Sequence, residues 1–141
     1  MPIYLWLLPG LLLGIILIVL ARRSARGERR FLAMGLVVAA ILYIGFAAVG
    51  DANVRWLLRE TLGAVFYGAL AWLGLRYSVW WLVLGWATHP AWDIFLHLTG
   101  DGSTFTPPWY AVGCVSLDLL VAAYLAAQTL RQTNPGTDKW R

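Results

Sequence analysis

The residues of this chain that could carry out chemistry lie in its C-terminal half. His89, Asp93 and His97 follow one another at intervals of four residues, and Cys114 and Asp118 repeat that interval farther along. Four residues turn an α-helix by about 40° beyond a full turn, so each set occupies one narrow face of its helix. Imidazole, carboxylate and thiolate groups bind transition metals, and imidazole and carboxylate groups also transfer protons.

A short loop with a Pro-Pro pair separates the two sets, so the helices that carry them are expected to be antiparallel neighbours. Counted inward from the loop at about 1.5 Å per residue, Asp93 and Cys114 both lie at about 7 Å. His89 and Asp118 both lie at about 13 Å by the same count. The sequence therefore predicts polar side chains that meet at two levels between these helices.

Glu60 adds a third helix to this cluster. Counted from the start of its helix, Glu60 lies about 5 Å in and nearly level with His97. A charged side chain at the middle of a bilayer costs about 2.5–3.5 kcal/mol on insertion scales. We therefore expect the histidines, the aspartates and Glu60 to face one another or a water-filled cavity rather than lipid.

The first interpretation of this cluster is a metal centre with a divalent transition metal as cofactor. Histidine nitrogens together with carboxylate oxygens suit Zn or Fe, and also Cu or Mn, whereas Mg and Ca prefer oxygen ligands alone. The predicted metal ligands are His89, Asp93, His97 and Cys114. The predicted catalytic residues are Asp118 and Glu60. A carboxylate that is free of the metal can act as a general base towards metal-bound water.

Two other interpretations use the same residues. Histidines and carboxylates can pass protons from one to the next along this face of the helices without a metal. They can also form a hydrogen-bonded core in which His89 contacts Asp118 and Asp93 contacts a neighbouring helix. The spacing of His89, Asp93 and His97 is less specific than the His-Glu-x-x-His motif of zinc enzymes, because pairs four residues apart also arise by chance.

The elements that must position these residues are helices that cross a membrane. Hydrophobic residues make up 60% of the 141-residue chain and charged residues only 13%, whereas soluble domains are about 25% charged. A spanning helix needs about 20 predominantly apolar residues. Five stretches meet that length, residues 3–21, 31–49, 57–75, 79–98 and 109–128. The sequence predicts one all-α domain, residues 1–141, that is an integral membrane bundle of five transmembrane helices.

The distribution of basic residues predicts the orientation of this bundle. Of the 11 Lys and Arg residues, only Arg55 and Arg59 face outward if the N-terminus is outside and the C-terminus is cytoplasmic. Basic residues favour cytoplasmic loops. The first helix is followed by arginines and not preceded by them, which is the reverse of a cleavable signal peptide. We therefore expect a multi-pass protein of the cell inner (plasma) membrane.

Several function classes find no support in the sequence. The net charge of +4 is explained by orientation, so no nucleic-acid partner is predicted. Cys114 is the only cysteine, which excludes a disulfide within the chain. The sequence contains no phosphate-binding loop, serine triad or haem attachment motif. The expected partners are membrane lipids, with a second copy of the chain or a larger membrane complex as alternatives.

Part of the sequence resembles a known family. The run from Gly85 to Asp93 reads Gly-Trp-Ala-Thr-His-Pro-Ala-Trp-Asp, and His97, a proline-bearing loop, Cys114 and Asp118 follow it. This pattern resembles a family of short bacterial membrane proteins with five helices that is catalogued as a domain of unknown function. Many members of that family have two adjacent histidines where this chain has a Leu-His pair. The resemblance implies that the face with His89, Asp93 and His97 matters for function, and it does not identify a reaction.

Together these observations favour a small membrane protein with a buried His/Asp site near the outer leaflet. The leading hypothesis is a metal-dependent reaction, hydrolytic or redox, on a lipid-soluble or small substrate. The alternatives are a transporter of protons, ions or small solutes and an accessory subunit of a membrane complex. The sequence leaves open whether the protein is an enzyme. Few polar residues fall in the inner half of the predicted bundle, which weighs against a path through it.

Overall fold

The structure is a computed structural model that describes residues 2–133. Within that range the chain is helical and contains no β-strand, as the sequence predicted. The five α-helices are α1 (Leu7–Arg23), α2 (Glu28–Val49), α3 (Val54–Arg76), α4 (Val79–Trp92) and α5 (Pro108–Thr133). The shorter segments are the 3₁₀ helices η1 (Ile3–Trp6) and η3 (Asp101–Thr104) and the π-helix η2 (Asp93–Leu98).

Three helical stretches are long and apolar enough to cross a membrane, Ile3–Arg23, Glu28–Val49 and Pro108–Gln132. The sequence analysis expected five. α3 differs because Arg55, Arg59 and Glu60 lie in its first turns. α4 differs because its regular helix has only 14 residues before the chain continues as η2. α3 and α4 thus differ from simple spanning segments, and both carry residues of the polar cluster.

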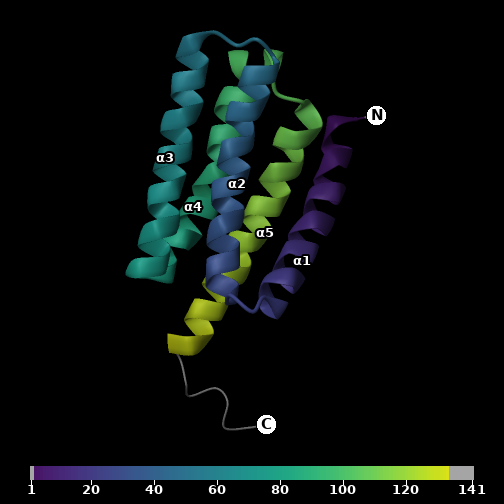
Figure 1. Ribbon diagram of the computed structural model, residues 1–141. Helices are drawn as coiled ribbons and strands as arrows, with labels where there is room; N and C mark the ends of the chain where they lie inside the picture. Colours follow the sequence, from purple (N-terminus) through teal and green to yellow (C-terminus); the bar gives the residue numbers. More distant parts are fainter. Residues whose placement is uncertain (1, 134–141) are drawn as a thin grey trace.

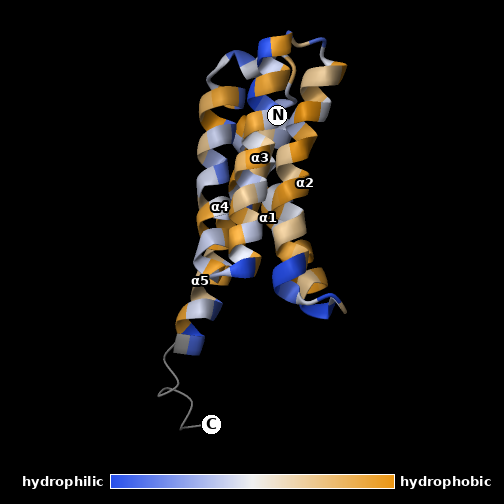
Figure 2. Ribbon diagram, turned by 60° about the vertical axis from the view of Figure 1, so that its left-hand side comes forward, coloured by the Kyte–Doolittle hydropathy of each residue, from blue (hydrophilic) through white to orange (hydrophobic). Residues whose placement is uncertain are grey.

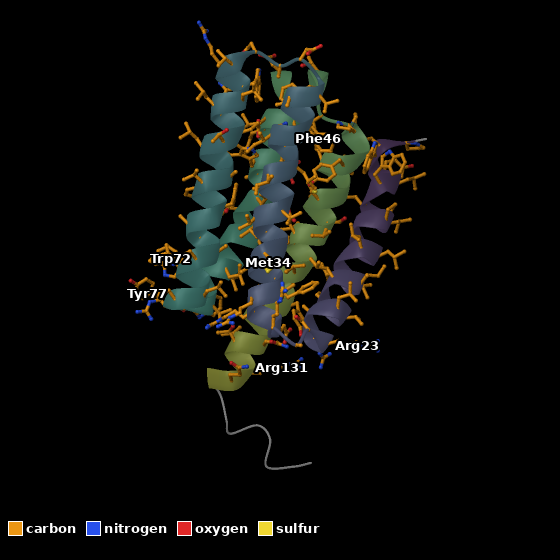
Figure 3. All side chains as sticks on the ribbon, in the orientation of Figure 1. Arg23, Met34, Phe46, Trp72, Tyr77 and Arg131 are labelled. Atoms are coloured by element: carbon orange, nitrogen blue, oxygen red, sulfur yellow. The ribbon has the colours of Figure 1, made fainter. Side chains whose placement is uncertain are left out.

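The helices run up and down in one bundle (Figure 1). α5 packs against both α1 and α4, and α3 packs against both α2 and α4. The connections α1–α2 and α3–α4 lie at the same end of the bundle as the last turns of α5. Arg23 and Arg131 mark this end in Figure 3. Helices that are distant in sequence, α1 and α5, therefore lie side by side.

Basic residues gather at that end of the bundle, where Figure 2 shows hydrophilic turns. They are Arg22, Arg23, Arg26, Arg29, Arg30, Arg76 and Arg131. Arg55 and Arg59 lie at the start of α3, at the opposite end. Lys139 and Arg141, which the sequence analysis counted with the first group, lie outside the described residues. The charge asymmetry seen in the sequence is thus an asymmetry between the two ends of the fold.

The apolar core fills the half of the bundle nearer to the basic end. Leu32 and Leu36 of α2 pack there with Trp86 of α4 and Val121 of α5. The outer faces of the helices expose many large apolar side chains instead of charges, for example Leu8, with an exposed fraction of 64%. Polar side chains of the interior lie in the other half of the bundle.

Glycines let α1 approach α5 closely. A Cβ atom at Gly10 would lie 2.1 Å from the carbonyl oxygen of Gly113 and 2.2 Å from Oγ of Ser116. A Cβ atom at Gly14 would lie 3.0 Å from Leu120. Ser116 also donates a hydrogen bond to the carbonyl oxygen of Leu7 at 2.8 Å. The spacing of Gly10 and Gly14 thus serves packing within the bundle, because small residues permit close contact between helices.

Side-chain caps fix the starts of α3 and α4. Asn53 accepts hydrogen bonds from two backbone amides in the first turn of α3, at 3.1 and 3.2 Å. Ser78 caps α4 by accepting a hydrogen bond from the amide of Trp80 at 3.4 Å. Such caps satisfy amides that lack partners within the helix. They also set the levels at which Glu60 and His89 face the interior of the bundle.

Candidate metal centre

His89 of α4 lies at the centre of a fully buried polar group. Its Nδ1 atom lies 2.8 Å from Oδ2 of Asp118 on α5 and 3.5 Å from Oδ2 of Asp93, the first residue of η2. All three side chains are 0% exposed. One potential ligand atom from each residue lies within 4.8 Å of the other two. These three residues, the His89 group below, could therefore hold a metal ion.

Tyr43 of α2 belongs to the same region, although the sequence analysis did not assign it to the site. Its hydroxyl donates a hydrogen bond to Oδ1 of Asp93 at 2.5 Å. Its ring stacks on His97, with ring centroids 3.9 Å apart and planes 12° apart. A signal was present in the sequence, since Tyr43 is the only ionisable residue between positions 31 and 49. Tyr43 links Asp93 to His97.

His97 and Glu60 form a second buried contact. The Nε2 atom of His97 lies 3.5 Å from Oε1 of Glu60, and the two side chains are 0% and 1% exposed, respectively. The other ring nitrogen of His97, Nδ1, lies 3.0 Å from Oγ1 of Thr106. The indole N–H of Trp92 donates to Oε2 of Glu60 at 3.3 Å. The level shared by Glu60 and His97 in the sequence thus corresponds to proximity in the fold.

The π-helical form of η2 explains why His97 remains inside the bundle. In a regular α-helix, each step of four residues would carry His97 farther from the line through His89 and Asp93. A π-helix bonds residue i to residue i+5, so the chain rotates less per residue. The side chain of His97 therefore turns back towards the line through His89 and Asp93. The amide of Thr99 donates to the carbonyl of Ile94 at 2.9 Å in this pattern. The sequence analysis expected a helix over residues 79–98, and the last six of these residues form the π-helix η2.

Most of the buried polar atoms that lack a hydrogen-bond partner belong to the His89 group or to the pair of His97 and Glu60. Six buried side-chain atoms of the described residues have no hydrogen-bond partner, and they are Glu60 Oε1, Trp86 Nε1, His89 Nε2, Asp93 Oδ2, His97 Nε2 and Asp118 Oδ1. Buried polar atoms in proteins nearly always have a partner. All but the Trp86 atom belong to residues that the sequence analysis proposed as site residues.

Cys114 is buried. It does not belong to the set of ligand atoms around His89 that lie within 4.8 Å of one another. Together with Trp6, Leu13 and Trp109 it lines an apolar groove of about 310 Å³ between α1 and α5. Tyr110, which lines the same groove, packs edge-on against Tyr43, with ring centroids 5.4 Å apart. The groove is thus separated from the polar interior by aromatic side chains.

The chain matches the model of a protein family over residues 5–131, and that family is described as "Family of unknown function (DUF6010)". The chain belongs to this family. The matched range contains every residue of both buried contacts, and it extends well beyond the C-terminal pattern on which the resemblance rested. No curated protein and no solved structure matches the chain.

In this member of the family, the predicted site residues fall into three places. His89, Asp93 and Asp118 form one group, His97 and Glu60 form a neighbouring pair, and Cys114 lies at the groove. The predicted roles of His89, Asp93, His97 and Cys114 as ligands, and of Asp118 and Glu60 as catalytic residues, stay predictions. Their joint burial in one half of the bundle agrees with a shared function.

Replacing Tyr43 with phenylalanine is expected to lower the free energy of unfolding by about 1–2 kcal/mol. The ring that stacks on His97 is kept, whereas the hydroxyl that donates to Asp93 is lost, and a buried carboxylate oxygen is left unpaired. Titration of the purified protein with SDS in mixed micelles measures this change. The control is Tyr77→Phe, which alters an exposed tyrosine at the end of α3. Equal effects of the two substitutions would contradict the prediction.

Proposed function

We propose that this protein is a multi-pass protein of the cell inner membrane with five crossings, its N-terminus outside and its C-terminus in the cytoplasm. Three helices have the length and composition of spanning segments. α4 and η2 together cover residues 79–98, a length sufficient for a fourth crossing. α3 has 23 residues, and the arginines at its start lie where a long side chain can reach headgroups. The basic end of the bundle then faces the cytoplasm.

The His89 group binds a divalent transition metal in this proposal. The observation that carries it is the convergence of three fully buried ligand residues, with ligand atoms within 4.8 Å of one another. Two ligands bound about 2.0–2.1 Å from a tetrahedral ion are about 3.4 Å apart. The separation of 3.5 Å between His89 Nδ1 and Asp93 Oδ2 is close to that edge and long for a hydrogen bond. The same nitrogen lies 2.8 Å from Oδ2 of Asp118, at hydrogen-bond distance, so this contact would have to lengthen when the ion binds.

The charge of the group supports the same proposal. Every salt bridge of the described residues involves a histidine, so neither aspartate of the group is paired with a lysine or an arginine. Two ionised aspartates exceed the charge of His89 even when its imidazole is protonated. Uncompensated buried charge is strongly unfavourable. A divalent cation would offset it, and the imidazole of His89 suits Zn, Fe or Cu, whereas the two carboxylates also suit Mn.

A metal-dependent reaction on a lipid-soluble or small substrate is the use that we propose for this centre. A bound metal lowers the pKa of a coordinated water and polarises a substrate oxygen. All three residues of the His89 group are closed to water in the bundle. The apolar groove beside Cys114 opens between α1 and α5 on a side that faces lipid in the proposed orientation. A substrate that dissolves in the membrane would approach from this side, and the rings of Tyr43 and Tyr110 would have to move to admit it to the centre.

Proton conduction is the second candidate, and one observation favours it. Asp118, His89, Asp93 and Tyr43 form a chain of short contacts, and the Tyr43 ring continues that chain to His97. Chains of acids and histidines carry protons in membrane proteins. The apolar core between this chain and the basic end interrupts a path through the bundle. A metal-free protein would favour this candidate or an accessory role in a membrane complex.

Elemental analysis of the detergent-purified protein tests the proposal. The cells are grown with added Zn and Fe, and no chelator is used during purification. The wild type is expected to contain metal in whole-number stoichiometry, and His89→Ala and Asp93→Ala are each expected to lose one equivalent per chain. The control Asp101→Ala, at an exposed aspartate, is expected to retain all of it. A wild type without metal, or full retention in both variants, would refute the metal centre.

A further inference from the structure

The contact between His97 and Glu60 has the geometry of two metal ligands and not of a direct hydrogen bond. An N–H···O bond is about 2.7–3.2 Å long, whereas Nε2 of His97 and Oε1 of Glu60 are 3.5 Å apart. Two ligands of a tetrahedral ion such as Zn²⁺ are separated by about 3.4 Å. Both facing atoms are buried and have no hydrogen-bond partner among the described residues. The distance between the two atoms therefore suits a metal ion that both of them bind.

The far sides of both side chains are held by partners of the kind that orient metal ligands. Nδ1 of His97 contacts Oγ1 of Thr106 at 3.0 Å, and Oε2 of Glu60 accepts a hydrogen bond from Trp92 at 3.3 Å. Ligating histidines almost always use their second nitrogen in this way, and ligating carboxylates are themselves hydrogen-bonded. These bonds direct the unpaired atoms of His97 and Glu60 towards each other.

Two glycines make room for this arrangement. A Cβ atom at Gly102 of η3 would lie 2.7 Å from Nδ1 of His97. A Cβ atom at Gly63 of α3 would lie 2.6 Å from the indole ring of Trp92. The histidine ring thus sits against the η3 backbone, and the indole sits against α3. The stacked Tyr43 ring, 3.9 Å from the His97 centroid, closes the other face.

We infer that His97 and Glu60 bind a second divalent transition-metal ion, at a position separate from the His89 group. Neither residue belongs to the set of ligand atoms within 4.8 Å of one another around His89. Two protein ligands leave the other coordination positions open, which is one more open position than in catalytic zinc sites, where three protein ligands leave one position for water or substrate. Glu60 is then a ligand instead of the catalytic carboxylate that the sequence suggested. The inference goes beyond the proposed function, since each position can exist without the other.

Zn²⁺ content per chain, measured by elemental analysis, tests this inference. We expect two equivalents in the wild type and one equivalent in His97→Phe, which keeps an aromatic ring against Tyr43 and removes the ligand nitrogen. Glu60→Gln keeps an acceptor for Trp92 and is expected to bind the second equivalent at least tenfold more weakly. The control is Glu28→Gln, which changes the only other glutamate of the chain, near the basic end. That control is expected to retain two equivalents.

Comparison with His89→Ala separates the two proposals. One equivalent in the wild type that is lost in His89→Ala and retained in His97→Phe overturns the second position and leaves the first. One equivalent that is lost in both variants shows a single shared ion and also overturns it. One equivalent lost only in His97→Phe supports the second position and overturns the first. A wild type that contains no Zn, Fe, Mn or Cu overturns both.

A titration of metal-depleted wild-type protein needs no variant that might fail to fold. Co²⁺ is added in steps, and its visible absorption reports coordination by protein ligands. An endpoint at two equivalents per chain is expected. An endpoint at one equivalent overturns the second position even if His97→Phe or Glu60→Gln cannot be purified.

Discussion

Metal-depleted Asp118→Ala protein is expected to be less stable than the wild type by about 3–5 kcal/mol in free energy of unfolding. Asp118 contacts Nδ1 of His89 at 2.8 Å, and both side chains are 0% exposed. Removing one partner of a buried pair leaves the other without compensation, which is the costly case for buried polar groups. The truncated side chain also leaves space beside α4. Unfolding by SDS titration, with a chelator present in both samples, isolates this effect from any contribution of bound metal.

Two further variants decide how the cost arises. Asp101→Ala removes an exposed aspartate in η3 and is expected to change the free energy of unfolding by less than about 0.5 kcal/mol. Asp118→Asn keeps the shape and an acceptor oxygen for His89, and its cost is expected to fall between the other two. If Asp118→Ala is as stable as Asp101→Ala, the pair with His89 does not stabilise the fold.

The contact between His89 and Asp118 could be predicted because it depends on depth alone. The rise per residue of an α-helix is constant, so two antiparallel helices joined by a short loop bring residues at equal distance from the loop to the same level. The same reasoning matched Glu60 with His97, whose facing atoms lie 3.5 Å apart. Membership of the family was also anticipated, from a pattern in the C-terminal part of the chain.

Rotation about the helix axis could not be predicted in the same way. Cys114 has the depth of Asp93, yet it lines the groove towards α1. An amphipathic helix reveals its inner face by its periodicity, whereas α2 is apolar on all sides and gives no such signal. For this reason the sequence analysis did not assign Tyr43 to the site, although its hydroxyl donates a hydrogen bond to Asp93.

Local helix form was the other feature that the sequence did not reveal. A π-helix and an α-helix accept the same apolar residues, so η2 could not be distinguished from a continuation of α4. The helix form matters for the candidate site, because η2 holds both Asp93 and His97 on the buried side. The charged residues at the start of α3 also make a helix differ from its expected form. They make α3 less apolar than the spanning helix that the sequence analysis expected, and one of them, Glu60, is buried in the polar interior.

Gly10→Ala is expected to lower the free energy of unfolding by about 3 kcal/mol or more, because the new methyl group has no room. Its Cβ would lie 2.1 Å from the carbonyl oxygen of Gly113 and 2.2 Å from Oγ of Ser116. Neither the backbone of α5 nor the hydrogen bond from Ser116 to Leu7 can yield without moving one helix relative to the other. SDS titration measures the stability, and increased protease cleavage after the arginines that follow α1 reports its displacement.

Gly45→Ala is the matched control for this substitution. Gly45 lies within α2, and a Cβ atom there would meet nothing within 4 Å. Alanine is the better helix former by about 0.5–1 kcal/mol, so this variant is expected to be as stable as the wild type or slightly more so. The two variants add the same methyl group to a helical glycine and differ only in what that group meets. Equal stability of both would mean that α1 does not pack against α5 at Gly10, and the groove beside Cys114 would then have a different wall.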